Sequence, residues 1–88
     1  MKHKKGDVVK IYIIEKTNQY GTVYHNPINP NGWTVDVHCA ILYRDLQVCK
    51  NTASYLLGKS IERNQKYPDV FPIIDDITVR KLEIKFVD

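Results

Sequence analysis

The sequence has 88 residues, of which 43% are hydrophobic and 26% charged, and its formal net charge is +3. This composition is typical of a globular domain and excludes a disordered chain. A domain of this length buries only about 60% of the surface of its unfolded chain, so a roomy catalytic cleft is not expected. We therefore predict a single domain over residues 1–88 that binds a partner and is not an enzyme.

The hydropathy pattern gives no indication of a membrane segment or an export signal. A membrane-spanning helix needs an apolar run of about 20 residues, and the sequence has none. Residues 8–14 are too short for the apolar part of a signal peptide and contain Lys10. We therefore expect a cytoplasmic protein in which Cys39 and Cys49 are free, buried thiols.

The one dense cluster of positive charge lies in the basic N-terminal tail, residues 1–6, and contains Lys4 and Lys5. A net charge of +3 is only a mild excess for a nucleic-acid-binding domain. The chain also prefers Lys to Arg and is rich in Ile, Asn and Tyr, residues with AT-rich codons. That bias suggests a phage or another AT-rich bacterial genome as the origin.

The first half of the chain predicts a β-meander of three strands. Residues 7–15 are rich in β-branched residues and apolar on both alternating faces, as in a central strand. A turn at residues 16–19 precedes a second strand at residues 20–25. The segment 26–32 contains two Asn-Pro pairs and Asn-Gly, which favour a hairpin turn. A third strand then follows over residues 33–41.

In that third strand, alternation places the odd-numbered residues on one face, which we expect to be the core face. These residues are Trp33, Val35, Val37, Cys39 and Ile41.

After Tyr43 the apolar spacing becomes helical. The residues that recur at this spacing are Leu46, Cys49, Ala53, Leu56 or Leu57, and Ile61. The helix begins either at Asn51 or Thr52 or nearer Asp45, each of which is a favourable N-cap. It should end before Pro68 because the residue before a proline avoids the α region.

A final strand is predicted over residues 77–87, where the apolar phase slips between Val79 and Leu82 in the manner of a β-bulge. The predicted fold is therefore α+β: an antiparallel β-meander, one packed helix and a C-terminal strand. The segments Lys5–Val9 and Gly21–Tyr24 resemble the start of small SH3-like barrels. The resemblance implies a half-barrel form of the meander and carries no function with it.

Residues 53–60 loosely fit two motifs. With alanine in place of the first glycine they match a phosphate-binding loop, and residues 73–76 could supply the acidic strand end. The interior of the segment is bulky and apolar, however, and no buried strand precedes it. The same residues match the first half of a helix-turn-helix, but Pro68 leaves too little room for a recognition helix. A helix whose apolar residues face the core is the favoured interpretation.

The sequence offers donors for a metal or for catalysis, but no workable spacing. His38 and Cys39 are adjacent on a predicted strand and should point to opposite faces, which disfavours zinc and a thiol–imidazole pair. Asp75 and Asp76, with Asp69 nearby, fit a solvated turn better than an acid–base site. We therefore expect no catalytic residue, metal or cofactor.

Six tyrosines and one tryptophan exceed the needs of a thin core, so some should line a contact surface. The half-buried positions of an ordinary sheet remain the alternative for these residues. Our candidate partner-binding residues combine the lysines of the first strand and tail, the sheet tyrosines and the hairpin loop. They are Lys4, Lys5, Lys10, Tyr12, Tyr20, Tyr24, Asn29 and Asn31.

The function we expect is that of a small binding protein that occludes or sequesters a protein partner, as a phage or mobile-element inhibitor does. The alternative is a nucleic-acid-binding module, in which lysines contact phosphates and tyrosines stack on bases. A bound nucleotide and a homo-oligomer remain open, and a membrane partner is not expected.

Overall fold

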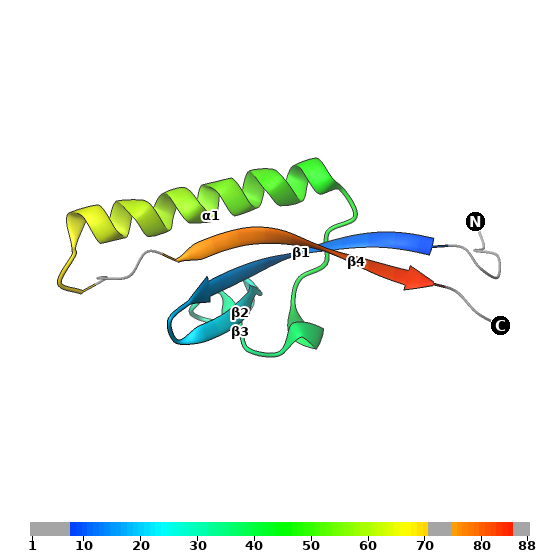
Figure 1. Ribbon diagram of the computed structural model, residues 1–88, viewed down its shortest axis with the longest axis horizontal. Coiled ribbons are helices and arrows are strands. Elements are labelled where there is room, and N and C mark those ends of the chain that lie inside the picture. Colours follow the sequence, from blue (N-terminus) through cyan, green and yellow to red (C-terminus); the bar gives the residue numbers. More distant parts are fainter. Residues whose placement is uncertain (1–7, 71–74, 86–88) are drawn as a thin grey trace.

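The computed structural model describes residues 8–70 and 75–85 of the chain. Its elements, in chain order, are β1 (Val8–Asn18), β2 (Gly21–His25), β3 (Trp33–Thr34), the 3₁₀ turn η1 (Val37–Cys39), α1 (Leu46–Lys66) and β4 (Asp76–Lys85). The strands form one antiparallel sheet in the order β3-β2-β1-β4. In Figure 1, α1 runs along the β1–β4 ribbon, and β2, β3 and η1 form a lobe on the other side of it. The α+β prediction is confirmed.

β1 is the central strand, as its two apolar faces predicted. Ile13 and Ile14 point to opposite faces of the sheet, and both side chains are fully buried. Ile14 packs with Cys49 and Ala53 of α1 and with Ile77 of β4 in the main core cluster. Each buried isoleucine contributes about 1.5–3 kcal/mol, so this strand anchors both layers of the fold.

β1 is longer than predicted, and β4 has no bulge. Residues 16–18 were expected in a turn, but β1 continues to Asn18 and each residue from Val8 to Thr17 has a partner on β4. The apolar phase of β4 slips for another reason. Val79 is paired with Ile14 on the helix-covered face, whereas Leu82 is paired with Ile11 on the opposite face. β4 therefore supplies apolar residues first to one face and then to the other, with no break in register.

The prediction of a long third strand over residues 33–41 is wrong. β3 ends at Thr34, and Val35 is 82% exposed. The reason is Asp36, whose Oδ1 accepts a hydrogen bond from the backbone N–H of His38 at 2.9 Å and so starts η1. Such local side-chain bonds compete with a strand ladder. Cys39, expected in the core, is exposed, whereas Cys49 is buried as predicted.

After η1 the chain returns to the sheet. The backbone N–H of Ile41 donates to the carbonyl of His25 at 2.9 Å, and Tyr12 and Tyr43 exchange two backbone hydrogen bonds of 2.7 and 2.8 Å. This bridge places Tyr43 against the edge of β1 ahead of α1. The described strands form an open sheet and do not confirm the SH3-like half-barrel.

α1 starts at the earlier of the two predicted positions. Oδ1 of Asp45 accepts hydrogen bonds from the backbone N–H groups of Gln47 and Val48 at 2.8 and 3.2 Å, which satisfies two free donors of the first turn. The helix ends at Lys66, before Pro68, as predicted. Residues 53–60 lie inside it, so their backbone amides are not available for a phosphate loop and no turn divides two helices. No helix in the described ranges combines the length and apolarity that a membrane crossing requires.

Candidate functional site

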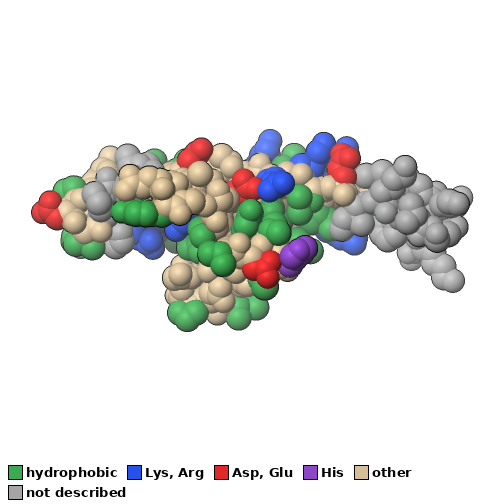
Figure 2. All heavy atoms as spheres, turned by 60° about the horizontal axis from the view of Figure 1, so that its bottom comes forward, with side chains coloured by type: hydrophobic (Ala, Val, Ile, Leu, Met, Phe, Trp, Pro, Cys, Tyr) green, Lys and Arg blue, Asp and Glu red, His purple; other side chains and the backbone are tan. Residues whose placement is uncertain are grey.

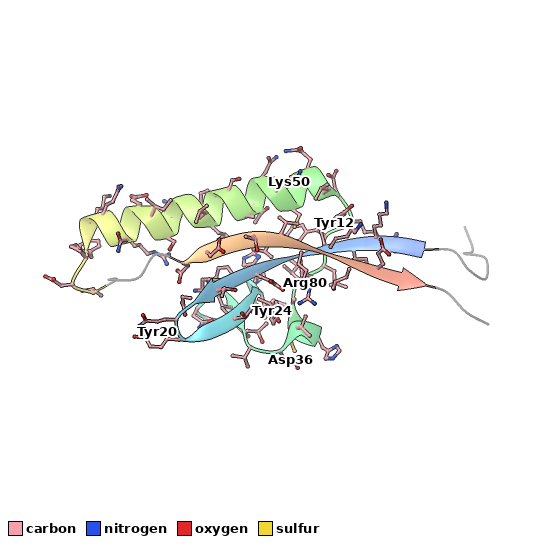
Figure 3. All side chains as sticks on the ribbon, viewed as in Figure 1. Tyr12, Tyr20, Tyr24, Asp36, Lys50 and Arg80 are labelled. Carbon is pink, nitrogen blue, oxygen red and sulfur yellow. The ribbon has the colours of Figure 1, made fainter. Side chains whose placement is uncertain are left out.

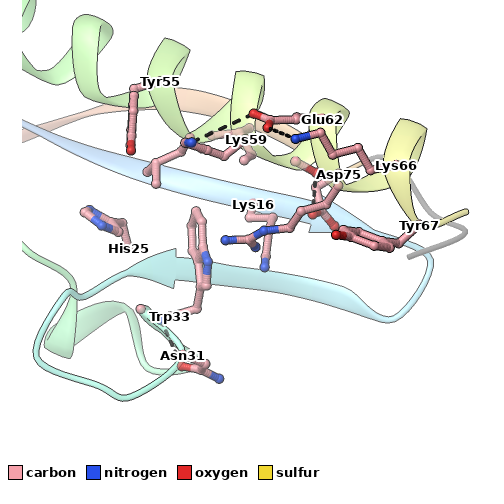
Figure 4. A pocket seen from close by; sticks show the side chains of 15 residues that line it. Lys16, His25, Asn31, Trp33, Tyr55, Lys59, Glu62, Lys66, Tyr67 and Asp75 are labelled. Atoms are coloured by element: carbon pink, nitrogen blue, oxygen red, sulfur yellow. Dashed lines mark hydrogen bonds and ion pairs between the residues drawn. The ribbon is translucent and has the colours of Figure 1, made fainter. Parts of the chain in front are cut away.

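A concave surface lies between the second half of α1 and the ends of β1, β2 and β3 (Figure 4). A hollow of about 430 Å³ opens there, and a second of about 390 Å³ extends it toward the β1–β2 turn. Both hollows share a wall, which is formed by Lys16, Asn31, Trp33 and Arg63. We refer to the two hollows together as the groove.

Lys16 and Trp33 form the shared wall from the sheet side. The ammonium of Lys16 lies 4.3 Å from the centre of the Trp33 ring, within the range of a cation–π interaction. Burial lowers the pKa of Lys16, the negative charge of Asp75 opposes that effect, and the positive charge of Arg63 adds to it. The groove therefore holds a partly desolvated cation, which any anion that enters would stabilise.

Asp75 is engaged in structural hydrogen bonds. Ser60, which is buried in α1, donates to Oδ2 at 2.9 Å, and the side-chain amide of Asn18 donates to Oδ1 at 2.8 Å. The carboxylate thereby ties the helix to the end of β1 and to the start of β4. We conclude that Asp75 fixes the shape of the groove and is not a free acid or base.

The helix wall carries three cations that follow one another along α1: Lys59, Arg63 and Lys66. Glu62 pairs with Lys66 at 2.9 Å and with Lys59 at 3.8 Å, and the hydrogen bond from Lys66 lowers its pKa. Among the described residues, the guanidinium of Arg63 makes no ion pair. With Lys16, the first hollow has four basic and two acidic side chains, so it carries an excess of positive charge.

Aromatic side chains alternate with these cations. Tyr55 is 64% exposed, and the ammonium of Lys59 lies 5.6 Å from the centre of its ring. Tyr67 closes the far end and is also exposed. On the sheet side, His25 and Trp33 pack edge to face with ring centres 5.5 Å apart. Figure 4 shows the Tyr55 and Trp33 rings on opposite sides of the hollow. The groove therefore offers π-faces next to positive charge.

His25 stands at the inner end of the groove. Burial lowers the pKa of its imidazole, and Nδ1 lies 3.5 Å from the hydroxyl of Tyr43. This distance makes a weak hydrogen bond. Among the described residues, the groove lining includes no cysteine, and its one serine is bonded to Asp75.

The loop from Asn26 to Gly32 holds the sheet side of the groove in place by its own hydrogen bonds. The amide of Asn29 donates to the carbonyl of Trp33 at 2.9 Å, and Oδ1 of Asn31 accepts from the backbone N–H of Trp33 at 3.0 Å. Gly32 has a φ of 81°, a left-handed conformation that glycine adopts without strain. These bonds orient the indole before any ligand arrives.

Of the predicted site residues that the structure describes, only Tyr20 and Asn31 line the same hollow. Lys4 and Lys5 lie outside the described residues. Lys10 is exposed near the start of β1, at the other end of the strand from the groove. Tyr12 is half-buried and packs against the core cluster. Figure 3 places Tyr12 near the start of α1, well away from Tyr20.

The remaining four candidates lie closer to the groove. Tyr20 is 81% exposed in the β1–β2 turn and lines the second hollow, and Asn31 lines both hollows. Asn29 is half-buried and bonded within the loop. Tyr24 is half-buried and is directly paired with Glu15. Because Glu15 and Lys16 are adjacent on β1, the side chain of Tyr24 lies on the sheet face opposite to that of Lys16.

Sequence reasoning missed most of the groove. Its helix side could have been found, because Tyr55, Lys59, Arg63 and Lys66 recur at intervals of three or four residues, the spacing of one helix face. The sheet side could not, because Lys16 was placed in a turn and Trp33 in a strand that faced the core.

Two further findings concern metal ligands and similarity to known proteins. Within residues 8–70 and 75–85, no three His, Cys, Asp or Glu side chains are close enough together to hold a metal ion. Comparison with protein-family models, with curated proteins and with solved structures finds no match to this chain. The function must therefore be argued from the groove itself.

Proposed function

We propose that this chain is a non-enzymatic binding protein whose groove takes single-stranded nucleic acid. The observation that carries the proposal is the shared wall of the groove, where the cations Lys16 and Arg63 lie beside the indole of Trp33. Single-strand binders combine a positive channel for the phosphates with aromatic faces for the bases. Both features meet here on pre-oriented elements.

The charges favour a phosphate-bearing ligand. The carboxylate of Asp75 accepts two hydrogen bonds and that of Glu62 is paired with two lysines, so both acidic side chains are already engaged within the protein. Burial disfavours the ammonium of Lys16, and the negative charge of a phosphate would stabilise it. Binding would also release counterions from the nucleic acid.

The aromatic side chains favour a single strand over a duplex. Tyr55, Tyr67 and Trp33 present rings at the surface of an open groove, and such rings reach base faces only where the bases are unstacked. The two hollows, at about 430 and 390 Å³, adjoin along their shared wall. Their extent suits a short run of nucleotides better than one isolated ring.

The proposal is tested by fluorescence anisotropy with a labelled oligothymidylate of about 12 nucleotides. We expect binding that weakens steeply between about 50 and 200 mM salt. Arg63→Gln should weaken binding about tenfold, since a charge-assisted hydrogen bond contributes about 1.5–3 kcal/mol. Lys50→Gln is the matched control because Lys50 is an exposed cation of the same helix outside the groove (Figure 3). Equal losses in both variants would contradict the proposed site.

A protein partner is the second candidate, and exposed hydrophobic side chains of the lobe, two of which also line the second hollow, favour it. Tyr20, Ile28 and Val35 are 81, 89 and 82% exposed, and all three belong to the β2–β3 lobe or its turns. Figure 2 shows separate hydrophobic side chains at the free end of that lobe. Large exposed hydrophobic side chains of this kind are ones that a protein partner could cover. The cytoplasmic location and the phage-type inhibitor role remain predictions that rest on composition.

These two candidates are separated by a pull-down from bacterial lysate with and without nuclease. A partner retained after nuclease treatment, and lost in an Ile28→Ser variant, would favour protein docking on the lobe, because Ile28 lines neither hollow of the groove. Recovery that disappears with nuclease would favour the groove.

A further inference from the structure

β4 forms one edge of the sheet. Its inner side pairs with β1 along ten consecutive residues, and no described strand pairs with its outer side. The unpaired N–H and C=O groups of such a long edge are a template for another strand. The opposite edge is different, because β3 has only two residues.

A hollow of about 350 Å³ lies next to this edge, between α1 and β4. Its lining residues come from those two elements only: Lys50, Ala53, Ser54, Leu57, Ile77, Thr78 and Val79. Because β1 contributes nothing to it, the hollow is on the outer side of the helix–strand contact. The surface beside the free edge is therefore hollowed and partly apolar.

The side chains of β4 favour a second copy of the same strand as the occupant. In an antiparallel pair with twofold symmetry, the residue on the axis opposes itself and its neighbours oppose each other. Centring on Arg80, Lys81 or Glu83 would bring identical charges face to face. Centring on Leu82 opposes leucine with leucine, and Lys81 of each copy with Glu83 of the other.

Lys81 and Glu83 can exchange their ion pair within one chain for ion pairs between two copies. Within one chain they form an ion pair of 3.3 Å, and both side chains are about half exposed. An exposed pair of this kind contributes little to stability, so it can be replaced by pairs between two copies at small cost.

We propose that two copies of this chain associate through their β4 edges, antiparallel and centred on Leu82. The dimer continues the sheet across the axis and pairs residues 79–85 of the two edges with each other. The twofold axis stands perpendicular to the sheet, so both α1 helices lie on the same face. Both grooves then open on one side of the molecule and can engage one strand together, a consequence that rests on the proposed function while the dimer does not.

The test is sedimentation equilibrium of the full chain over a range of concentrations, without nucleic acid. We expect a species of twice the 10.3 kDa chain mass that dissociates on dilution. Lys81→Glu and Glu83→Lys each place like charges opposite one another at two symmetric positions. Each should raise the dimer Kd about tenfold or more. An equimolar mixture of the two variants restores opposite charges at both positions and should form a heterodimer.

Arg44→Glu serves as a control, because it reverses an exposed cation that precedes α1 and lies outside both β4 and the hollow beside it. Circular dichroism and thermal melting establish that each variant is folded. A wild-type chain that stays monomeric at every concentration would overturn the proposal. So would a dimer that both single substitutions leave unchanged, because its register would then not be centred on Leu82. Since no ligand is present, failure here leaves the groove proposal standing.

Discussion

Lys16→Met separates the ligand-binding role of Lys16 from its contribution to the fold. Methionine keeps the long apolar stem and removes the charge. The folded protein loses a cation–π interaction with Trp33, which is worth about 0.5–1 kcal/mol at a partly exposed site. It also loses the cost of holding a partly buried ammonium, the effect that lowers the pKa of Lys16. These contributions have opposite signs, so we expect the free energy of unfolding to change by less than about 1 kcal/mol.

Binding should respond differently. If Lys16 contacts a phosphate, its removal costs a charge-assisted hydrogen bond of about 1.5–3 kcal/mol, a loss of about tenfold or more in affinity. The slope of log K against log salt should also become shallower by about 0.7, the value for one phosphate on a single strand. Urea unfolding measures the first quantity and anisotropy titrations at several salt concentrations measure the others. A variant destabilised by more than about 2 kcal/mol with unchanged salt dependence would refute this reasoning, because Lys16 would then be structural.

Three further predictions follow from the described contacts. Tyr55→Ala should weaken oligonucleotide binding by about 1–3 kcal/mol, the usual value for loss of one stacking ring, while the melting temperature hardly changes because Tyr55 is 64% exposed. Burial lowers the pKa of His25, so between that value and the ordinary value near 6.5 the unfolded chain binds more protons than the folded one. Stability should therefore fall as pH drops below about 6.5, and His25→Gln should reduce this fall in urea titrations at several pH values. Asp45→Ala removes the acceptor for two helix N–H groups and should cost about 1 kcal/mol in urea unfolding, and a change below about 0.3 kcal/mol would show that the cap is dispensable.

The parts of the fold that follow from regular patterns were predictable. β-branched residues on both faces identified β1 as the central strand, and apolar spacing identified α1 and its end before Pro68. Asp45 was a candidate cap because of its chemistry and position. Each of these depends on residues within one turn or one strand, so the sequence carries the information locally.

The lobe was not predictable in the same way. Alternation from Trp33 to Ile41 predicts a strand. The Asp36 side chain, however, accepts a hydrogen bond from the backbone N–H of His38, and the chain forms η1 there instead. Such competition between a side chain and a ladder is decided by the tertiary position of the segment. The phase slip in β4 likewise looked like a bulge, because the sequence does not state which face of an edge strand is covered at each end.

The helix side of the groove follows from local sequence, whereas its sheet side depends on the tertiary structure. Tyr55, Lys59 and Arg63 share a helix face that the sequence displays, yet their significance depends on what faces them. Trp33 and Lys16 lie opposite that helix face for two reasons. β1 continues to Asn18, and the loop at residues 26–32 is held by hydrogen bonds within its own backbone. Contact between the two sides is a property of the fold and not of either segment.

Trp33 is the only tryptophan in the chain, so its fluorescence reports directly on the groove. The decisive measurement is a titration of the wild-type protein with an unlabelled oligothymidylate while Trp33 emission is recorded. Our account predicts saturable quenching, because a base stacks on the indole, and recovery of emission as salt is raised from about 50 to 200 mM. Unchanged emission throughout the titration would contradict it, whether the oligonucleotide binds elsewhere on the chain or does not bind at all.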